Sequence, residues 1–371
     1  MARSSLRQRR AKASVFLASA TVLTTVLATL LQAGPADARP AAQSAVAGVG
    51  CGTNVGRVPL DTTYNAVTKR YELNDPQRGN HKTYDMHNGT SGTGTLVTDD
   101  DNVWCEGGRQ SDAVAAHYIH AVVWDHLLAA FGRKGVRGDG RGGCSRVHYG
   151  NNYLNAFWDS ATSCVTYGDG TTVPNRSLVR IETGAHEMTH GVTAATANLG
   201  FTGEPGALNE ATSDIIAAAV EFSAANAADP GDYLIGEHRD VNGESALRYM
   251  DRPSRDGQSK DYWYAGIGQL HPVYAAGPAN HFFYLLAEGS GPKVINGVSY
   301  DSPTYDGRPV TGIGRAAAEK IWYRALTVYL TSSATYRSAR TATLAAAADL
   351  YGTNSPEHRA VASAWTAVNV T

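Results

Sequence analysis

The sequence AHEMTHG at residues 185–191 places two histidines four positions apart, with a glutamate directly after the first. On an α-helix, positions i and i+4 lie on one face, so His186 and His190 can present two imidazoles to one metal ion. Glu187 is turned away from that face but stays close enough to take a proton from a water on the metal. The alternative is a helix that carries two histidines at its surface, and the rest of the sequence decides between them.

Three carboxylates follow on a second predicted helix, in ALNEATSDIIAAAVEF at residues 207–222. Glu210, Asp214 and Glu221 stand at i, i+4 and i+11 and fall within about 40° of one another at 3.6 residues per turn. Catalytic zinc takes about three protein ligands and a water, and two histidines with one glutamate form an established set. The pattern predicts Glu210 as the third zinc ligand. It also predicts that Asp214 accepts the second N–H of a ligand histidine.

The residues around this motif resemble the thermolysin-like neutral metalloproteases. The resemblance extends from about Gly52 to the C-terminus. It is carried by AHEMTHGVT (185–193), GALNEATSD (206–214), TTYNAVTKRYELND (62–75), RGNHKTYD (78–85), VHYGNNYLNAFWD (147–159), YGDGTT (167–172), ALRYMDRPSRDG (246–257), DYWYAGIG (261–268) and GPANHFFYLLAEGSG (277–291). It implies a zinc-dependent endopeptidase in which Glu187 takes a proton from a zinc-activated water. The implied fold has a β-rich N-terminal domain, an α-helical C-terminal domain and the zinc helix at the seam.

The resemblance also implies residues for substrate and for a structural metal. Asn155 and Ala156 would pair with an extended peptide, as an exposed strand edge can. Arg248 would hold the substrate carbonyl, although taken alone it is equally consistent with a surface arginine. The carboxylates at places where the family binds calcium are Glu182, Glu221, Asp232 and Glu237. Calcium takes about six to eight oxygens, so four carboxylates with carbonyls and water suffice for one ion. Leu234 replaces a further glutamate, so we expect one calcium and not two.

Two positions of the expected active site depart from the family pattern. Phe201 stands where members carry a tyrosine whose hydroxyl stabilises the oxyanion, and Val273 stands where they carry a histidine donor. Neither side chain can donate a hydrogen bond. His271 lies two residues before Val273 and is either a displaced substitute or an ordinary loop histidine. Loss of one such donor typically costs about 10²–10³ in rate. We therefore expect slower chemistry rather than none, because Glu187 and the zinc ligands remain.

The cleavage preference is a second open question. Family members accept a bulky apolar side chain just after the cut, in a pocket lined by residues before and within the zinc helix. Here Thr183 replaces an aliphatic residue on that helix, and Arg176 and Arg180 precede it. The arginines are either solvated, as most loop arginines are, or one of them pairs with a substrate carboxylate. The second case would shift the preference toward Asp or Glu.

The N-terminal segment has the pattern of a secretory signal peptide. Basic residues within 3–12 precede an apolar run over about residues 14–31, and the small-x-small sequence ADA follows at 36–38. The run is long for a signal peptide, so an uncleaved membrane anchor is the alternative. We expect a secreted, extracellular protein that is not attached to a membrane. Only about a dozen residues, 39–50, separate the predicted cleavage site from the mature-like sequence, so we also expect no long pro-region.

The four cysteines fit an oxidising compartment, where an even number suggests disulfides. Four cysteines allow three pairings. Cys144 and Cys164 bracket one short segment, so we expect them to pair, and by elimination Cys51 pairs with Cys105. A metal site built from cysteines is the weaker alternative, because no two of them have C-x-x-C spacing.

Composition and periodicity indicate a globular protein of two domains. The chain has 371 residues, and its net charge of -2 gives no reason to expect a nucleic-acid partner. Short β-prone runs and turn signals fill about residues 52–172, interrupted by one helix predicted over 111–132. Helical periodicity dominates from residue 181 onward. We predict an α+β fold with a signal peptide over 1–38, a short leader over 39–50, a β-rich domain over 51–195 that ends in the zinc helix, and an α-helical domain over 196–371.

Three functions are consistent with these features. The first is a secreted, monomeric zinc endopeptidase that acts on polypeptides. The second is a zinc protein that binds peptides with little turnover, and the third is an extracellular structural protein in which the metal only holds the fold. Glu187 is not a metal ligand, so a protein kept only for binding would have little reason to retain it. This favours the enzyme.

Overall fold

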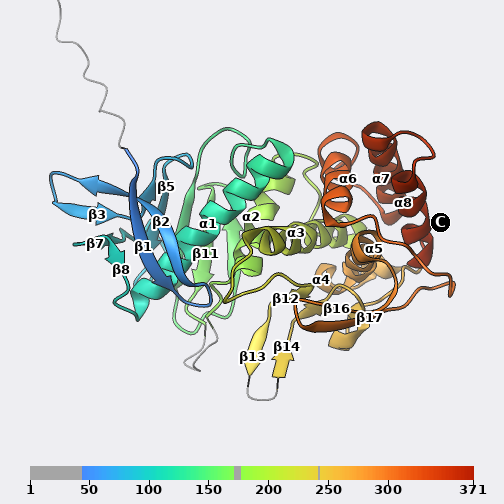
Figure 1. Ribbon diagram of the computed structural model, residues 1–371, viewed down its shortest axis with the longest axis horizontal. Helices are drawn as coiled ribbons and strands as arrows, with labels where there is room; N and C mark the ends of the chain where they lie inside the picture. Colours follow the sequence, from blue (N-terminus) through green and yellow to red (C-terminus); the bar gives the residue numbers. More distant parts are fainter. Residues whose placement is uncertain (1–43, 171–176, 241–242) are drawn as a thin grey trace, which may run out of the picture. The chain divides into compact units, whose positions relative to one another are not determined.

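Strands dominate the first half of the computed structural model and helices the second half (Figure 1), which confirms the expected α+β fold class. The structure describes residues 44–170, 177–240 and 243–371. The predicted signal peptide over 1–38 lies outside these ranges. Within them, no helix has both the length and the apolar character needed to cross a bilayer.

The first sheet has five strands in the order β7-β3-β2-β1-β8. The strands are β1 (Val46–Gly52), β2 (Gly56–Asn65), β3 (Arg70–Glu72), β7 (Thr98–Asp99) and β8 (Val103–Trp104). Residues 46–50, which we expected to belong to the leader, form the first part of β1 and pair along their whole length with β2. Their small side chains allow close packing, because a Cβ added at Gly50 would lie 2.5 Å from the Val114 side chain. The small side chains that indicated a leader are therefore needed for β1 to pack closely against its neighbours.

The second sheet places a short strand at its edge, beside the predicted zinc helix. Its order is β10-β11-β9-β5-β4, with β6 paired to β5. The strands are β4 (Asn74–Asp75), β5 (His81–Asp85), β6 (Thr95–Leu96), β9 (Cys144–Tyr149), β10 (Ala156–Asp159) and β11 (Cys164–Gly168). The edge strand β10 pairs only with β11, in antiparallel fashion. Both expected disulfides are confirmed, Cys51–Cys105 and Cys144–Cys164.

Helix α1 (Arg109–Phe131) contacts strands of both sheets and also helices α2 and α3. The helix predicted over 111–132 would have Ser111 as its N-cap, but the N-cap is Gly108, three residues earlier. The predicted end is confirmed, because Gly132 takes the left-handed conformation, with φ of 66°, that favours glycine at a helix terminus.

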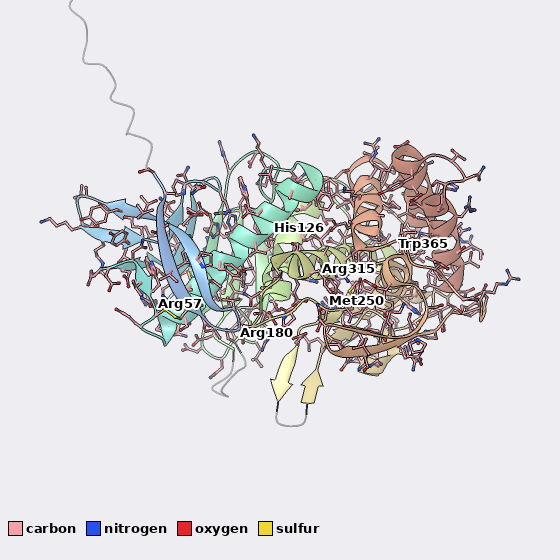
Figure 2. All side chains as sticks on the ribbon, viewed as in Figure 1. Arg57, His126, Arg180, Met250, Arg315 and Trp365 are labelled. Carbon is pink, nitrogen blue, oxygen red and sulfur yellow. A yellow bond between two sulfur atoms is a disulfide. The ribbon has the colours of Figure 1, made fainter. Side chains whose placement is uncertain are left out.

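The second half of the chain consists of helices joined by short hairpins and loops. The helices are α2 (Ile181–Ala194), α3 (Gly203–Ala224), α4 (Pro272–Ala275), α5 (Gly277–Glu288), α6 (Arg315–Val328), α7 (Tyr336–Tyr351) and α8 (Pro356–Ala367). The short strands are β12 (Leu234–Ile235), β13 (His238–Asp240), β14 (Gly243–Ser245), β15 (Arg248–Tyr249), β16 (Gly291–Ile295) and β17 (Val298–Ser302). Trp365 of α8 lies among these helices (Figure 2), and its ring stacks on Phe282 of α5 at a centroid distance of 3.8 Å. This aromatic packing joins α8 to α5.

Three histidines are buried between α1 and the second sheet. The His81 and His120 rings stack at a centroid distance of 3.5 Å, and His117 lies 5.7 Å from His81. Burial, with a further contribution from the neighbouring His117, lowers the pKa of His120 to about 3. Burial also holds the pKa of His81 well below its ordinary value. These rings are therefore neutral in the folded protein at neutral pH.

Acidification is expected to destabilise the protein through this cluster. The unfolded chain binds a proton at His120 near pH 6.5, whereas the folded protein keeps the ring neutral to about pH 3. Stability is therefore complete above pH 6.5 and decreases as the pH falls. His120→Phe should reduce the slope of unfolding free energy against pH, between pH 4 and 6, by about 1.4 kcal/mol per unit. Denaturant titrations at several pH values measure this slope. His87→Gln is the control, because its side chain is 62% exposed. Equal slopes for wild type and His120→Phe would contradict this assignment.

Candidate active site

Helix α2 carries the HExxH residues and lies directly on the edge strand β10. The two elements approach closely at Gly191, where an added Cβ would lie 2.6 Å from the Trp158 ring. Helix α2 is the helix that the sequence predicted for the HExxH motif, and it lies beside the β-rich half as expected. The approach brings His186, Glu187 and His190 to the wall of a cavity that β10 also lines.

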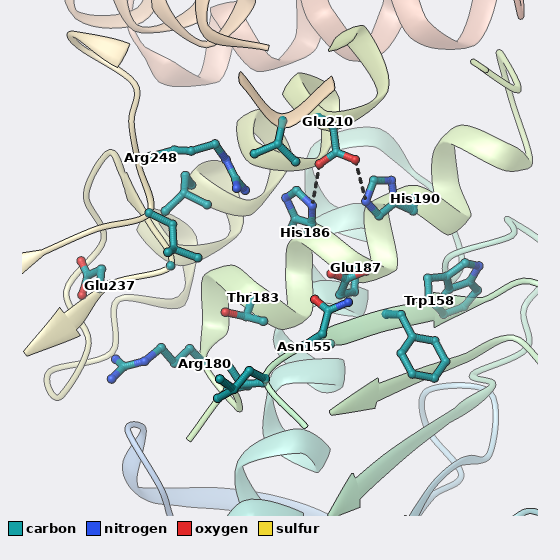
Figure 3. A pocket seen from close by; sticks show the side chains of 18 of the residues that line it. Asn155, Trp158, Arg180, Thr183, His186, Glu187, His190, Glu210, Glu237 and Arg248 are labelled. Atoms are coloured by element: carbon teal, nitrogen blue, oxygen red, sulfur yellow. Dashed lines mark ion pairs between the residues drawn. The ribbon is translucent and has the colours of Figure 1, made fainter. Parts of the chain in front are cut away.

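Glu210 of α3 completes the group of side chains that the sequence predicted as metal ligands (Figure 3). Its carboxylate oxygens lie 3.5 Å from His186 Nε2 and 3.9 Å from His190 Nε2. The two imidazole rings are nearly perpendicular, with centroids 4.8 Å apart. The structure therefore brings together all three residues that the sequence predicted as zinc ligands.

The other nitrogen of each histidine is held by a polar side chain of α3. Asp214 Oδ1 lies 2.7 Å from His186 Nδ1, and Asn209 Oδ1 lies 2.9 Å from His190 Nδ1. Ser213 Oγ lies 3.2 Å from the same His190 nitrogen. A carboxylate can only accept and an amide oxygen can only accept, so both Nδ1 atoms donate and both Nε2 atoms are left to face Glu210. This is the tautomer that a metal ion requires.

The electrostatics of the cluster favour a cation. Burial opposes charge on His186, but the hydrogen bonds to Asp214 and Glu210 outweigh it and raise the pKa of His186 to about 10. Two imidazole nitrogens and one carboxylate match the nitrogen and oxygen ligands of catalytic zinc. The residues present therefore fit a zinc ion.

Asp214 connects the cluster to the rest of the domain. It is fully buried and also accepts hydrogen bonds from Arg248 Nε at 2.8 Å, Arg248 Nη2 at 2.7 Å and Asn280 Nδ2 at 2.8 Å. Burial alone would raise its pKa, but Arg248 and His186 hold the pKa of Asp214 below its ordinary value. Sequence reasoning missed Asn280, because 66 residues separate it from Asp214 and an asparagine on a helix gives no signal of its partner.

Glu187 has a different environment from Glu210. Its carboxylate lies within 4.8 Å of ligand atoms of both His186 and His190, but among the described residues it forms no ion pair with either. Burial raises the pKa of Glu187 to about 7, and the charge of Glu210 adds to the effect. By distance, Glu187 converges with the two histidines as Glu210 does, but the carboxylate of Glu210 approaches both Nε2 atoms to 3.9 Å or less.

The cavity beside these residues has a volume of about 710 Å³. Asn155 and Ala156 line it from the beginning of the edge strand, and Arg248 lines it while bonded to Asp214. The predicted substrate residues therefore lie in one cavity with the metal cluster. Three residues at its mouth are large, apolar and exposed: Leu154, Phe201 and Leu247.

The positions that depart from the family pattern also face this cavity. Phe201 is 73% exposed, so its ring is displayed at the mouth rather than packed in the core. His271 and Val273 both line the cavity, at the start of helix α4. His271 therefore has access to a bound substrate.

A second acidic cluster lies behind the N-terminus of α2. Glu182, Glu221 and Asp229 are at most 2% exposed, and their oxygens lie within 4.8 Å of one another. Burial raises the pKa of Glu182 to about 8, with Asp229 adding to the effect. Asp232 and Glu237 are also buried. Burial is the main reason that the pKa of Asp232 is raised to about 10, and a hydrogen bond between the two carboxylates adds to the effect. The sequence predicted all of these residues except Asp229.

Two residues connected with cleavage preference are placed on the cavity wall. Arg180 and Thr183 both line it (Figure 3), and Arg180 is only 5% exposed. The solvated position expected for a loop arginine is therefore wrong for Arg180, because the residue lies under the first turn of α2. Arg176 lies outside the described residues.

A helix with two histidines and a glutamate, between a β-rich and a helical half, is the arrangement of the metallopeptidase class. The family model "Thermolysin metallopeptidase, catalytic domain" matches residues 47–194, and "Thermolysin metallopeptidase, alpha-helical domain" matches residues 197–370. The chain belongs to the thermolysin metallopeptidase family.

Individual relatives agree with this assignment. The chain is 56% identical over 327 residues to the transglutaminase-activating metalloprotease of Streptomyces mobaraensis. This match covers 87% of this chain and 42% of that protein. It is 38% identical over 348 residues to thermolysin of Alicyclobacillus acidocaldarius. That match covers 91% of this chain and 60% of that protein. The chain thus spans about half the length of these curated relatives. The solved structure of the protealysin precursor, a metalloproteinase from Serratia proteamaculans, matches with a TM-score of 0.61 and 26% identity. That match covers 78% of this chain and 87% of that one.

Proposed function

We propose that this protein is a secreted zinc endopeptidase with Glu187 as its general base. The observation that carries the proposal is the cluster of two Nε2 atoms and the Glu210 carboxylate, with Glu187 beside it, on the wall of a cavity bordered by a strand edge. Two disulfides and the signal-like sequence over 1–38 support secretion.

The chain's own residues define the chemistry. His186, His190 and Glu210 would hold zinc, which supplies a Lewis acid that makes water more acidic and polarises a carbonyl. The Glu187 carboxylate accepts a proton from the attacking water and afterwards passes it to the leaving amine. Its raised pKa suits both steps, because a base with a pKa near the working pH both takes and returns a proton.

The edge strand provides the means of binding an extended peptide. Among the described residues β10 pairs on one side only, so its other edge has backbone groups that can accept a substrate strand. Asn155 and Ala156 stand at the start of that strand and line the cavity. Arg248 is held by Asp214 in a fixed direction, which suits a donor to a substrate carbonyl.

A peptide-binding protein with little turnover is the second candidate, favoured by one observation. Phe201 and Val273 line the cavity, and neither side chain can donate a hydrogen bond to the developing oxyanion. Each lost donor typically costs about 10²–10³ in rate. His271 lines the same cavity with an imidazole that can donate, so we assign it the role of oxyanion donor.

His271→Ala is expected to lower kcat by about 10²-fold with little change in KM, because a donor that acts only in the transition state does not contribute to ground-state binding. Steady-state kinetics on one peptide measure both constants. His87→Ala serves as the matched control, since its exposed side chain lies outside the cavity. A variant that stays within a few-fold of wild type would identify His271 as an ordinary loop residue.

We also propose one structural calcium ion at the acidic cluster. Five buried carboxylates in one place repel one another and hold protons unless a cation replaces them. The Oε1 atom of Glu221 has no hydrogen-bond partner among the described residues, which leaves it free to act as a ligand. The five carboxylates are Glu182, Glu221, Asp229, Asp232 and Glu237.

A chelation experiment on the purified mature protein tests both metals. Removal of all divalent ions should abolish peptide cleavage and lower the thermal midpoint. Zinc alone should then restore cleavage, and calcium alone should restore the midpoint without cleavage. Cleavage that survives complete zinc removal would refute the endopeptidase proposal. Zinc binding without any cleavage would favour the peptide-binding alternative. A thermal midpoint that does not change when calcium is added would refute the calcium proposal.

A further inference from the structure

Arg180 occupies a position that local helix energetics disfavour. It is the N-cap residue of α2, with φ of -131° and no side-chain capping bond. Serine, threonine, asparagine and aspartate are preferred there, because their oxygens accept hydrogen bonds from the first turn. A cation is also repelled by the partial positive charge at a helix N-terminus. Arg180 therefore does not stabilise the start of α2, and a residue that breaks a local rule often serves a site.

The guanidinium group of Arg180 is buried without a carboxylate partner. The side chain is 5% exposed, and among the described residues it forms no ion pair, while its Nε atom has no hydrogen-bond partner. A buried charge is costly unless an opposite charge compensates for it. The acidic cluster attracts Arg180 from a distance, because Arg180 lowers the pKa of the nearby Glu182 against the effect of burial. No direct pair forms with Glu237, although both residues line the cavity.

The direction of α2 places Arg180 on the cavity side of the helix. Arg180, Thr183 and Glu187 follow one another at i, i+3 and i+7, which is one stripe of a helix. All three line the cavity (Figure 3). At 1.5 Å per residue, Arg180 begins about 10 Å along the axis from Glu187. That interval suits one substrate side chain that extends from the scissile bond toward a long arginine.

The cavity wall is mixed in character. Leu178, Ile235 and Leu247 are apolar, whereas Ser177, Thr183, Glu237 and Arg248 are polar or charged. Arg248 is already paired with Asp214, so Arg180 is the arginine of this wall that still lacks a carboxylate partner among the described residues, and a substrate carboxylate could form a strong charge-assisted bond with it. An apolar side chain would instead leave the guanidinium unpaired.

We propose that Arg180 selects peptides with Asp or Glu next to the scissile bond, in the position just after the cut. The proposal rests on the endopeptidase function for its consequence in cleavage but not for its binding chemistry. The guanidinium pairs with the substrate carboxylate, and the Thr183 hydroxyl, in place of a bulkier apolar side chain, leaves room for the approach.

The test compares two matched peptides that differ only in Asp or Asn just after the cut, so that size is constant and charge changes. Calorimetry on the zinc-loaded protein should give a Kd ratio between about 10 and 100 in favour of Asp, reduced at high salt. Arg180→Met should bring the Kd ratio close to one. Arg180→Lys should retain part of the preference for Asp, because lysine keeps the positive charge but lacks the planar guanidinium that binds a carboxylate through two N–H groups. Arg308→Gln is the control, because that side chain is 86% exposed.

Binding is measured separately from turnover, so the two proposals fail separately. Absence of cleavage with a preserved Asp-to-Asn ratio in binding would refute the enzyme and support the role of Arg180. Equal affinity for the two peptides in wild type, or binding of neither, would overturn the role of Arg180. That role would also be overturned if Arg180→Lys and Arg180→Met altered only the calcium-dependent thermal midpoint, because Arg180 would then serve the acidic cluster alone.

Discussion

Glu187→Gln is expected to abolish nearly all peptide cleavage while leaving the fold and the zinc content unchanged. The amide has the size of the carboxylate but cannot accept a proton from water, so the general-base step is lost. The ligands remain, since Glu210 and not Glu187 lies within ion-pair distance of both histidines. Loss of a positioned base typically costs about 10²–10⁴ in rate. Peptide hydrolysis and metal analysis of the same preparation measure the two quantities.

Glu210→Gln provides the comparison that separates a ligand from a base. It removes a charge that lies 3.5 Å from His186 Nε2, so zinc content should fall together with activity. The assignment would be reversed if Glu187→Gln lost zinc and Glu210→Gln kept it. Cleavage by Glu187→Gln close to that of wild type would show that another group takes the proton.

Asp214→Asn is expected to weaken both the fold and the zinc site. The carboxylate accepts hydrogen bonds from His186, Asn280 and the charged Arg248, all at 2.7 or 2.8 Å. An amide of the same shape leaves Arg248, whose side chain is only 12% exposed, without its counter-charge, which costs about 3–5 kcal/mol of unfolding free energy. The amide oxygen can still accept from His186 Nδ1, but loss of the negative charge should reduce zinc affinity by about 10–100-fold.

Denaturant unfolding of the metal-free protein and competition with a zinc chelator measure these effects independently. Asp349→Asn is the matched control, because Asp349 forms an exposed ion pair with Arg324 at 2.8 Å. Exposed pairs contribute little, so that variant should behave like wild type in both assays. A stable Asp214→Asn with unchanged zinc affinity would show that Arg248 and His186 are held by other contacts.

Much of the site was predictable because its signals are local. The spacing of His186, Glu187 and His190 depends only on helix geometry, and the same holds for Glu210 and Asp214 on the next helix. Helical periodicity also predicted α1 and α3, with errors of a few residues at their ends, and the helical character of the chain from residue 181 onward. The family resemblance supplied Asn155, Ala156 and Arg248, and the structure places all three on the cavity wall.

The misses have one physical cause, since they concern partners that are distant in the sequence. Asn280 reaches Asp214 only because α5 packs on α3. Asp229 joins the acidic cluster because the chain after α3 turns back toward Glu182. The start of β1 was missed for a related reason, because its glycines appear featureless until Val114 is found where a side chain would lie.

The sequence by itself determined the kind of chemistry this protein can carry: two imidazoles, a ligand carboxylate and a base, on helices whose period sets their directions. The tertiary structure alone decided which nitrogen of each histidine faces Glu210, because Asn209 and Asp214 reach the other nitrogens only when α3 lies against α2. It also decided that Arg180 is buried beside the cavity and not solvated. A periodic pattern specifies which face of a helix is buried, but packing between distant segments specifies what that face contacts.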